Sequence, residues 1–119
     1  MRSKGTECME AILEEAPDID ILYAHNDDMA MGAIEVMEEH GIRPGVDIVI
    51  VSVDAQKSGL EALRQGKINC LVECSPYIGE ELMDLAIKVV SGEPFPEYTF
   101  VEEAIFTDTD DFSILPVRP

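Results

Sequence analysis

The sequence predicts an α/β fold, a parallel sheet with helices on both of its faces. Three short apolar runs, at 21–24, 48–53 and 68–73, have the length and the side chains of buried strands. A segment with apolar residues at helical spacing precedes each run, and a fourth such segment follows the last run. This alternation of helices and strands is typical of parallel sheets, because each helix returns the chain to start the next strand in the same direction.

The first half of the chain contains two predicted helices, at 4–16 and 28–40, on either side of the strand at 21–24. Pro17 ends the first helix, and Gly41 is suited to the position just after the second. The apolar faces consist of Met9, Ile12, Leu13 and Ala16 on the first helix, and of Met29, Gly32, Ala33, Val36, Met37 and His40 on the second.

The second strand is almost wholly apolar and β-branched, as in a strand buried on both faces. A short helix at 58–65 leads to the third strand. Ser75 is then a good N-cap and Pro76 suits the first position of a helix, whose apolar stripe runs through 78–90. After this helix we expect a turn or linker (93–98), an extended segment (99–106) and a tail of about a dozen residues.

The composition limits the classes of function. A chain of 119 residues forms one ordinary domain. Its net charge of −17 disfavours binding to nucleic acids and to anionic membrane surfaces, which are themselves negative. No run approaches the roughly 20 apolar residues of a membrane span. The chain also lacks the apolar core of a signal peptide, as would a piece of a longer exported protein.

The three cysteines are predicted to be buried, free thiols. Within an extended strand, Cys70 and Cys74 lie about 13 Å apart, at ~3.3 Å per residue. A disulfide requires Cα atoms within about 7 Å of each other, so these two should not pair. There is no C-x-x-C and no histidine at ligand spacing, so we expect neither a metal site nor a cofactor.

Polar residues follow all three predicted strands. His25, Asn26 and Asp27 come after the first strand, Asp54 after the second, and Glu73-Cys74-Ser75 ends the third. Ligands of parallel α/β sheets bind at the carboxyl ends of the strands. Asn26 offers both donors and an acceptor and Asp54 offers acceptors, which suits the neighbouring hydroxyls of a sugar.

A purely structural interpretation competes at each of these positions. Asn26 or Asp27 can cap the following helix, and Asp54 can form a turn after its strand. The two roles can also be divided, with Asp27 or Asp28 serving the helix while Asn26 faces the ligand. For His25, a hydrogen-bonded structural role is expected rather than that of a catalytic base, because no nucleophile accompanies it.

An enzyme with an acidic, Mg²⁺-binding phosphoryl-acceptor site is a third hypothesis. It requires paired acids after the first strand of the fold and a lysine after a later one. Asp27 and Asp28 are on the wrong strand, and no lysine follows the third strand. No glycine-rich loop for binding phosphate is present either. We therefore expect a binding protein rather than an enzyme.

Three segments together resemble the sugar-binding proteins of bacterial ABC importers, of the ribose and galactose type. They are PDIDILYAHNDDMAMGAIEVMEEHG (17–41), GVDIVIVSVDA (45–55) and LEALRQGKINCLVECSPYIG (60–79). AHNDDMA, VECSP and the late IFTDTDD are most similar to the galactofuranose-binding branch. The resemblance extends from about Met9 to Pro116. It implies an incomplete lobe of a type 1 periplasmic binding protein, with flavodoxin-like topology.

The resemblance also implies which residues bind the sugar. Asn26 and Asp54 match the family's residues that hydrogen-bond sugar hydroxyls. A third polar contact of the family falls at Cys74, beside Glu73. Cysteine is a weak hydrogen-bond donor, so Glu73 is the alternative for this contact.

The resemblance further implies how the chain is divided. Residues 1–74 form part of the carboxyl-terminal lobe. Residues 75–106 cross the hinge and carry a helix that packs on the amino-terminal lobe, and 107–119 are a returning segment and tail. The implied partners are a pentose or hexose and the membrane subunits of the importer. The implied location of the intact protein is periplasmic, or extracellular with a lipoprotein anchor.

Two further expectations follow. The effector domain of a LacI-type, sugar-responsive repressor shares the fold and the ND-x-MA-x-G pattern, and it is the alternative function.

In the family's sheet, the strand at 21–24 lies beside the lobe's first strand, which this chain lacks. We therefore expect an open edge there, an uncovered helix at 78–90, and a homodimer or larger oligomer of the chain.

Overall fold

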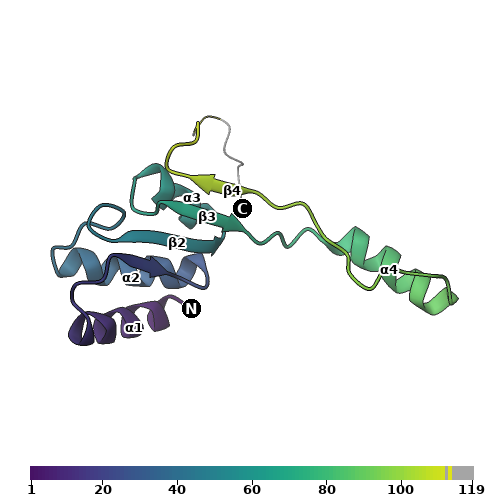
Figure 1. The fold of residues 1–119 in the computed structure, drawn as a ribbon, viewed down its shortest axis with the longest axis horizontal. Coiled ribbons are helices and arrows are strands. Elements are labelled where there is room, and N and C mark those ends of the chain that lie inside the picture. The colour runs from purple at the N-terminus through teal and green to yellow at the C-terminus, as the bar shows by residue number, and fades with distance from the viewer. Residues whose placement is uncertain (112, 114–119) are drawn as a thin grey trace.

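The computed structural model describes residues 1–111 and 113, so the predicted tail lies partly outside the described residues. Helices and strands alternate along the chain, as predicted. In chain order the elements are α1 (Arg2–Glu15), β1 (Ile21–Tyr23), α2 (Asp27–Glu39), β2 (Val49–Asp54), α3 (Lys57–Arg64), β3 (Cys70–Glu73), α4 (Gly79–Ser91) and β4 (Ile105–Thr107) (Figure 1).

The sheet has the strand order β1-β2-β3-β4 and is mostly parallel. β1, β2 and β3 run in the same direction, with Leu22 opposite Ile50 and Val53 opposite Val72. β4 comes from the end of the predicted extended segment and pairs antiparallel with β3, with Ile105 opposite Val72. The predicted α/β class is therefore confirmed, and β1 forms one edge of the sheet, as expected.

The prediction of helices on both faces is wrong for the described residues, because α1, α2 and α3 lie on one face (Figure 1). Burial alternates accordingly along the strands, with Ile50 and Leu71 wholly buried beneath the helices. On the opposite face Ile21, Tyr23 and Ile105 are 66%, 58% and 64% exposed. The cause is topological. Both connections between parallel strands cross the sheet in the same direction, and right-handed crossovers then place their helices on the same side.

Two helices of this layer pack at backbone distance. A Cβ atom at Gly5 of α1 would lie 2.1 Å from the carbonyl oxygen of Met29, and one at Gly32 of α2 would lie 2.2 Å from that of Arg2. Glycine at both positions allows the close crossing. Beneath it the core is continuous, and its largest wholly buried side chains are Met9, Ile34, Met37, Ile50, Leu60, Leu63, Ile68 and Leu71.

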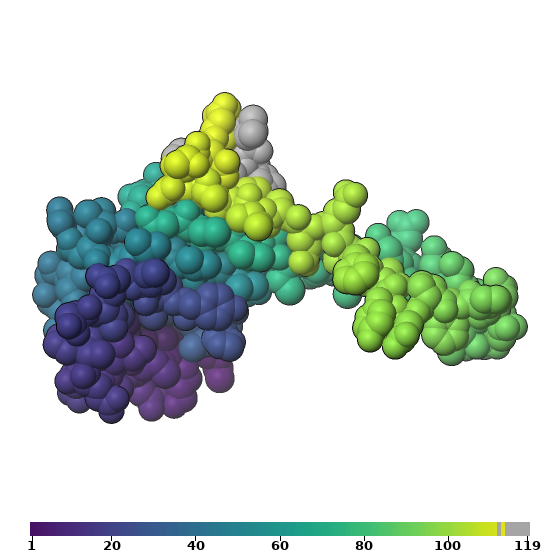
Figure 2. Space-filling model, viewed as in Figure 1, coloured from purple at the N-terminus to yellow at the C-terminus, as the bar shows by residue number. Residues whose placement is uncertain are grey.

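α4 projects away from the sheet. The segments that connect it to β3 and β4 form a narrow neck between this extension and the body of the molecule (Figure 2). The molecule therefore measures 58 × 34 × 22 Å. No residue of α4 is buried. Within the described part of the chain, no helix is both long and apolar enough to cross a membrane.

The helix begins later than predicted, at Gly79, with Ile78 as the N-cap residue. Ser75 does not cap it. The Ser75 hydroxyl instead accepts a hydrogen bond from the backbone N–H of Tyr77 at 3.3 Å, which closes a local turn before the helix. Serine forms such turns as readily as helix caps, and for this reason the start was misplaced.

Candidate functional site

An open pocket of about 310 Å³ lies at the carboxyl ends of β2 and β3. This volume is at the lower end of the range for small-molecule sites. Because neighbouring parallel strands end at the same edge, the residues after them meet there, as predicted. The pocket is lined by Asp54, Ala55, Gln56, Glu73, Cys74, Pro76 and Tyr77.

The chain turns sharply at Asp54 and Ala55, where β2 ends. Their φ angles are 109° and 56°, in the region that favours glycine. Such conformations cost on the order of 1–3 kcal/mol and persist only where the surroundings enforce them. At this turn, Oδ2 of Asp54 accepts a hydrogen bond from Nε2 of Gln56 at 3.0 Å. The turn thus presents a half-exposed carboxylate to the pocket.

Asp27 is wholly buried beneath this turn. Its Oδ1 accepts a hydrogen bond from the Ser52 hydroxyl at 2.7 Å, and its Oδ2 accepts one from the backbone N–H of Gln56 at 2.6 Å. α3 approaches so closely that a Cβ atom at Gly59 would lie 2.3 Å from Oδ2. Asp27 therefore joins the start of α2 to β2 and to the start of α3.

The environment of Asp27 raises the pKa of its carboxyl group. Burial is the main cause, because it disfavours the charged form. The hydrogen bonds from Ser52 and Gln56 oppose this effect, whereas the nearby carboxylates of Asp54 and Asp28 add to it. A buried carboxylate thus stands directly behind the pocket, although it does not line it.

Asn26 is the N-cap residue of α2. Its Oδ1 accepts a hydrogen bond from the backbone N–H of Met29 at 2.9 Å. Of the alternatives considered for this turn, helix capping by Asn26 is the one observed, and the Asp27 carboxylate is engaged with Ser52 and Gln56 instead. Within the described chain, the Asn26 amide group donates no hydrogen bond. Asn26 ends the strand next to β2 but is not among the residues that line the pocket.

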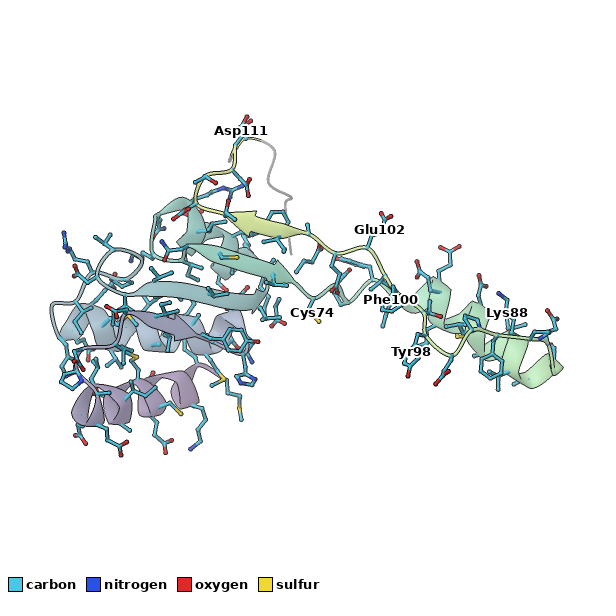
Figure 3. All side chains as sticks on the ribbon, viewed as in Figure 1. Cys74, Lys88, Tyr98, Phe100, Glu102 and Asp111 are labelled. Atoms are coloured by element: carbon cyan, nitrogen blue, oxygen red, sulfur yellow. The ribbon has the colours of Figure 1, made fainter. Side chains whose placement is uncertain are left out.

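Glu73 and Cys74 differ in exposure. Glu73 is 9% exposed, and its Oε2 accepts a hydrogen bond from the backbone N–H of Ala104 at 3.0 Å. On the segment that returns from α4, Oε1 of Glu103 accepts a hydrogen bond from the backbone N–H of Ser75 at 3.0 Å. These two carboxylates hold together the two segments that lead to and from α4. Cys74 is exposed and lies where the chain leaves the sheet towards α4 (Figure 3).

The prediction of buried thiols is wrong. All three cysteines are free, as expected, but Cys8 and Cys74 are exposed and Cys70 is half-buried. Cys70 lies on the face of the sheet that no described helix covers. Partial burial still raises the pKa of its thiol, to which the carboxylates of Asp108 and Asp110 contribute.

The sequence did not single out Gln56, Ala55 or Pro76 as pocket residues. For Gln56 the available signal was its place between the polar end of a strand and the next helix. His25 is exposed, and its ring contacts that of Tyr23 at a centroid distance of 5.4 Å, so the predicted hydrogen-bonded role is not what the structure shows. Among the described residues no cluster of His, Cys, Asp or Glu could hold a metal ion.

Parallel strands that end in an open pocket with carboxylates in its lining are typical of an α/β ligand-binding domain. Residues 2–94 match the model of the periplasmic binding protein domain, and the chain belongs to this family. It is 36% identical over 99 residues to the galactofuranose-binding protein YtfQ of Escherichia coli, covering 81% of this chain and 31% of that protein. The chain therefore falls among binding proteins rather than enzymes.

Solved structures agree with this assignment. A Mycobacterium smegmatis protein in complex with β-D-fucofuranose is 50% identical, with a TM-score of 0.82 over 91% of this chain and 36% of that one. The binding protein of the arabinose ABC transporter from Shewanella sp. ANA-3, bound to L-arabinofuranose, is 34% identical, with a TM-score of 0.79 over 91% of this chain and 37% of that one. The chain thus spans about a third of the length of these relatives.

Proposed function

We propose that this chain forms one wall of the sugar-binding cleft in the solute-binding component of a carbohydrate ABC importer. The observation that carries the proposal is the Asp54 turn, where a strained backbone presents a carboxylate to an open pocket at the carboxyl edge of the sheet. A carboxylate that accepts from adjacent hydroxyls suits a neutral polyol. The relatives named above favour an importer over a repressor.

Each of the four predicted site residues has its own role in this proposal. Asp54 accepts hydrogen bonds from sugar hydroxyls, and the amide group of Asn26 donates one while its carbonyl oxygen caps α2. Cys74 lines the cleft as an exposed side chain. Glu73 also lines the cleft, where its carboxylate accepts a hydrogen bond from the backbone N–H of Ala104 and helps to fix this wall.

The substrate class is a pentose or hexose, bound in its furanose form. Three relatives support this choice, since one is named for galactofuranose and the other two are bound to β-D-fucofuranose and L-arabinofuranose. In this proposal the other wall of the cleft is formed by the rest of the complete protein. The residues of that wall help to determine which of these sugars is preferred.

The extension that carries α4 fits the proposed architecture. Residues 1–74 belong to the carboxyl-terminal lobe and 75–106 cross the hinge and place α4 on the amino-terminal lobe, with the chain back at the sheet in β4. The exposed apolar side chains of α4 support this assignment, since a helix with no buried residue needs a partner. The complete protein would act in the periplasm, or outside the cell on a lipid anchor, and deliver sugar to the importer's membrane subunits.

Two substitutions in the complete protein test the site. Asp54→Ala should weaken sugar binding about 5- to 150-fold, because buried hydroxyls or protein groups lose their partner at roughly 1–3 kcal/mol. Asn26→Asp keeps the helix-capping oxygen but loses the amide donors. It should melt like the parent and bind sugar more weakly, as titration calorimetry would show. Unchanged affinity in Asp54→Ala would reduce Asp54 to a turn residue and overturn the assignment.

A further inference from the structure

Gln56 connects the two carboxylates of the site region. It is the N-cap residue of α3, but its side chain makes no cap hydrogen bond. Instead its backbone N–H donates to Asp27 at 2.6 Å, and its side-chain Nε2 donates to Oδ2 of Asp54 at 3.0 Å. Hydrogen bonds of its backbone and of its side chain therefore connect the buried Ser52–Asp27 pair to the carboxylate in the pocket.

The hydrogen bond to Asp54 has a geometric consequence. An aspartate side chain rotates about two bonds, and at a half-exposed position nothing else in the described structure holds its carboxylate. Fixing Oδ2 restricts that rotation and leaves Oδ1 as the oxygen available to a ligand. Preorganisation of this kind raises affinity because less freedom is lost on binding.

We propose that Gln56 is a positioning residue for sugar recognition, which orients the Asp54 carboxylate in the pocket and is itself held by Asp27. This inference rests on the proposed function. A structural role alone would give a different result, because an exposed hydrogen bond between two neighbouring side chains adds little to stability. Loss of the Gln56 amide should therefore change sugar affinity without changing the melting temperature.

The test is titration calorimetry of the complete protein with D-fucose and L-arabinose, together with thermal melting. Gln56→Ala should weaken binding of the sugar that the parent prefers by about 3- to 10-fold at an unchanged melting temperature. The matched control is Gln65→Ala. Gln65 also donates an exposed side-chain hydrogen bond to a carboxylate, that of Glu61 at 2.9 Å, but lies away from the pocket. Its loss should leave affinity unchanged.

A second variant, Gln56→Glu, has nearly the same shape but places a carboxyl group beside Asp54. The other charged groups around position 56 are Asp27 behind the turn and Glu73 in the pocket lining, together with Lys57, Glu61 and Arg64, which line the adjoining hollow with Gln56. At about pH 8, repulsion should weaken binding more than Gln56→Ala does.

The outcomes separate the two levels of the proposal. If Asp54→Ala loses affinity while Gln56→Ala and Gln56→Glu bind like the parent, the role of Gln56 is overturned and the proposed function stands. If Gln56→Ala loses affinity and melting temperature together and Gln56→Glu binds no more weakly than Gln56→Ala, Gln56 is merely structural and its positioning role is overturned. If the parent binds neither sugar, nor any other pentose or hexose, the proposed function and this inference both fail.

Discussion

Asp27 has both carboxylate oxygens engaged in a place that water does not reach. A buried carboxylate is costly unless it is hydrogen-bonded, and here each oxygen receives one donor from a different element. The residue therefore sets the distance between α2, β2 and α3 just behind the proposed sugar site.

A dependence of stability on pH follows from Asp27. Its pKa is raised above the ordinary value near 3.8, so the folded protein binds this proton more tightly than the unfolded chain does. Its contribution to the free energy of unfolding is therefore fully present below about pH 3.8 and is lost as the pH rises through the raised pKa. Asp27→Asn should remove this contribution, since its amide can donate to Ser52 and its carbonyl oxygen can accept from Gln56.

The measurement is denaturant unfolding of the parent and of Asp27→Asn at a series of pH values. The free energy of unfolding of the parent, relative to the variant, should fall as the pH rises. A difference that stays constant with pH would show that the Asp27 pKa is not raised. Asp27→Ala is the disruptive comparison and should cost about 1–3 kcal/mol, because it leaves buried donors unpaired.

Individual residues of the site could be predicted only in part. Asn26 and Asp54 follow their strands, so the sequence places both at the carboxyl edge. The choice of helix cap could not be predicted, because asparagine and aspartate cap helices equally well. It depends on whether Asp27 reaches Ser52, which lies 25 positions along the chain.

Among the elements, α3 is the one most constrained by its contact with Asp27. Gly59→Ala should destabilise the protein by about 1–3 kcal/mol, although alanine favours helices, because the added methyl group would overlap the Asp27 carboxylate. Gly79→Ala at the start of α4 is the control, since a Cβ atom there meets nothing within 4 Å. Thermal melting that ranks the two variants equally would contradict the close contact.

The elements themselves were largely predictable, since apolar spacing located the four helices and three parallel strands. β4 was not recognised as a strand, because its three residues gain regularity only by pairing with β3. The run at Ile48–Val53 suited burial on both faces, yet burial depends on what covers the sheet. Within the described chain only one face has that cover.

At the scale of the whole molecule, the described part of the chain leaves one strand edge and two apolar surfaces open. They are the free edge of β1, the uncovered face of the sheet and the exposed side chains of α4. Burying one large apolar side chain is worth ~1.5–3 kcal/mol, against a typical domain stability of about 5–15 kcal/mol. We therefore expect the 119-residue chain alone to form a homodimer or larger oligomer through β1 or α4. Light scattering at micromolar concentration would show it, and a folded, cooperatively melting monomer would contradict it.

The central claim is that this chain supplies one wall of a sugar-binding cleft and needs the other wall to bind. The most direct test is calorimetric titration of the complete protein and of the 119-residue chain, side by side, with a panel of pentoses and hexoses. One wall cannot bury most of a small ligand's surface, as such sites normally do. The complete protein should therefore bind one sugar per molecule, and the 119-residue chain should bind none at micromolar concentration. Micromolar binding by the 119-residue chain, or no binding of any sugar by the complete protein, would contradict the claim.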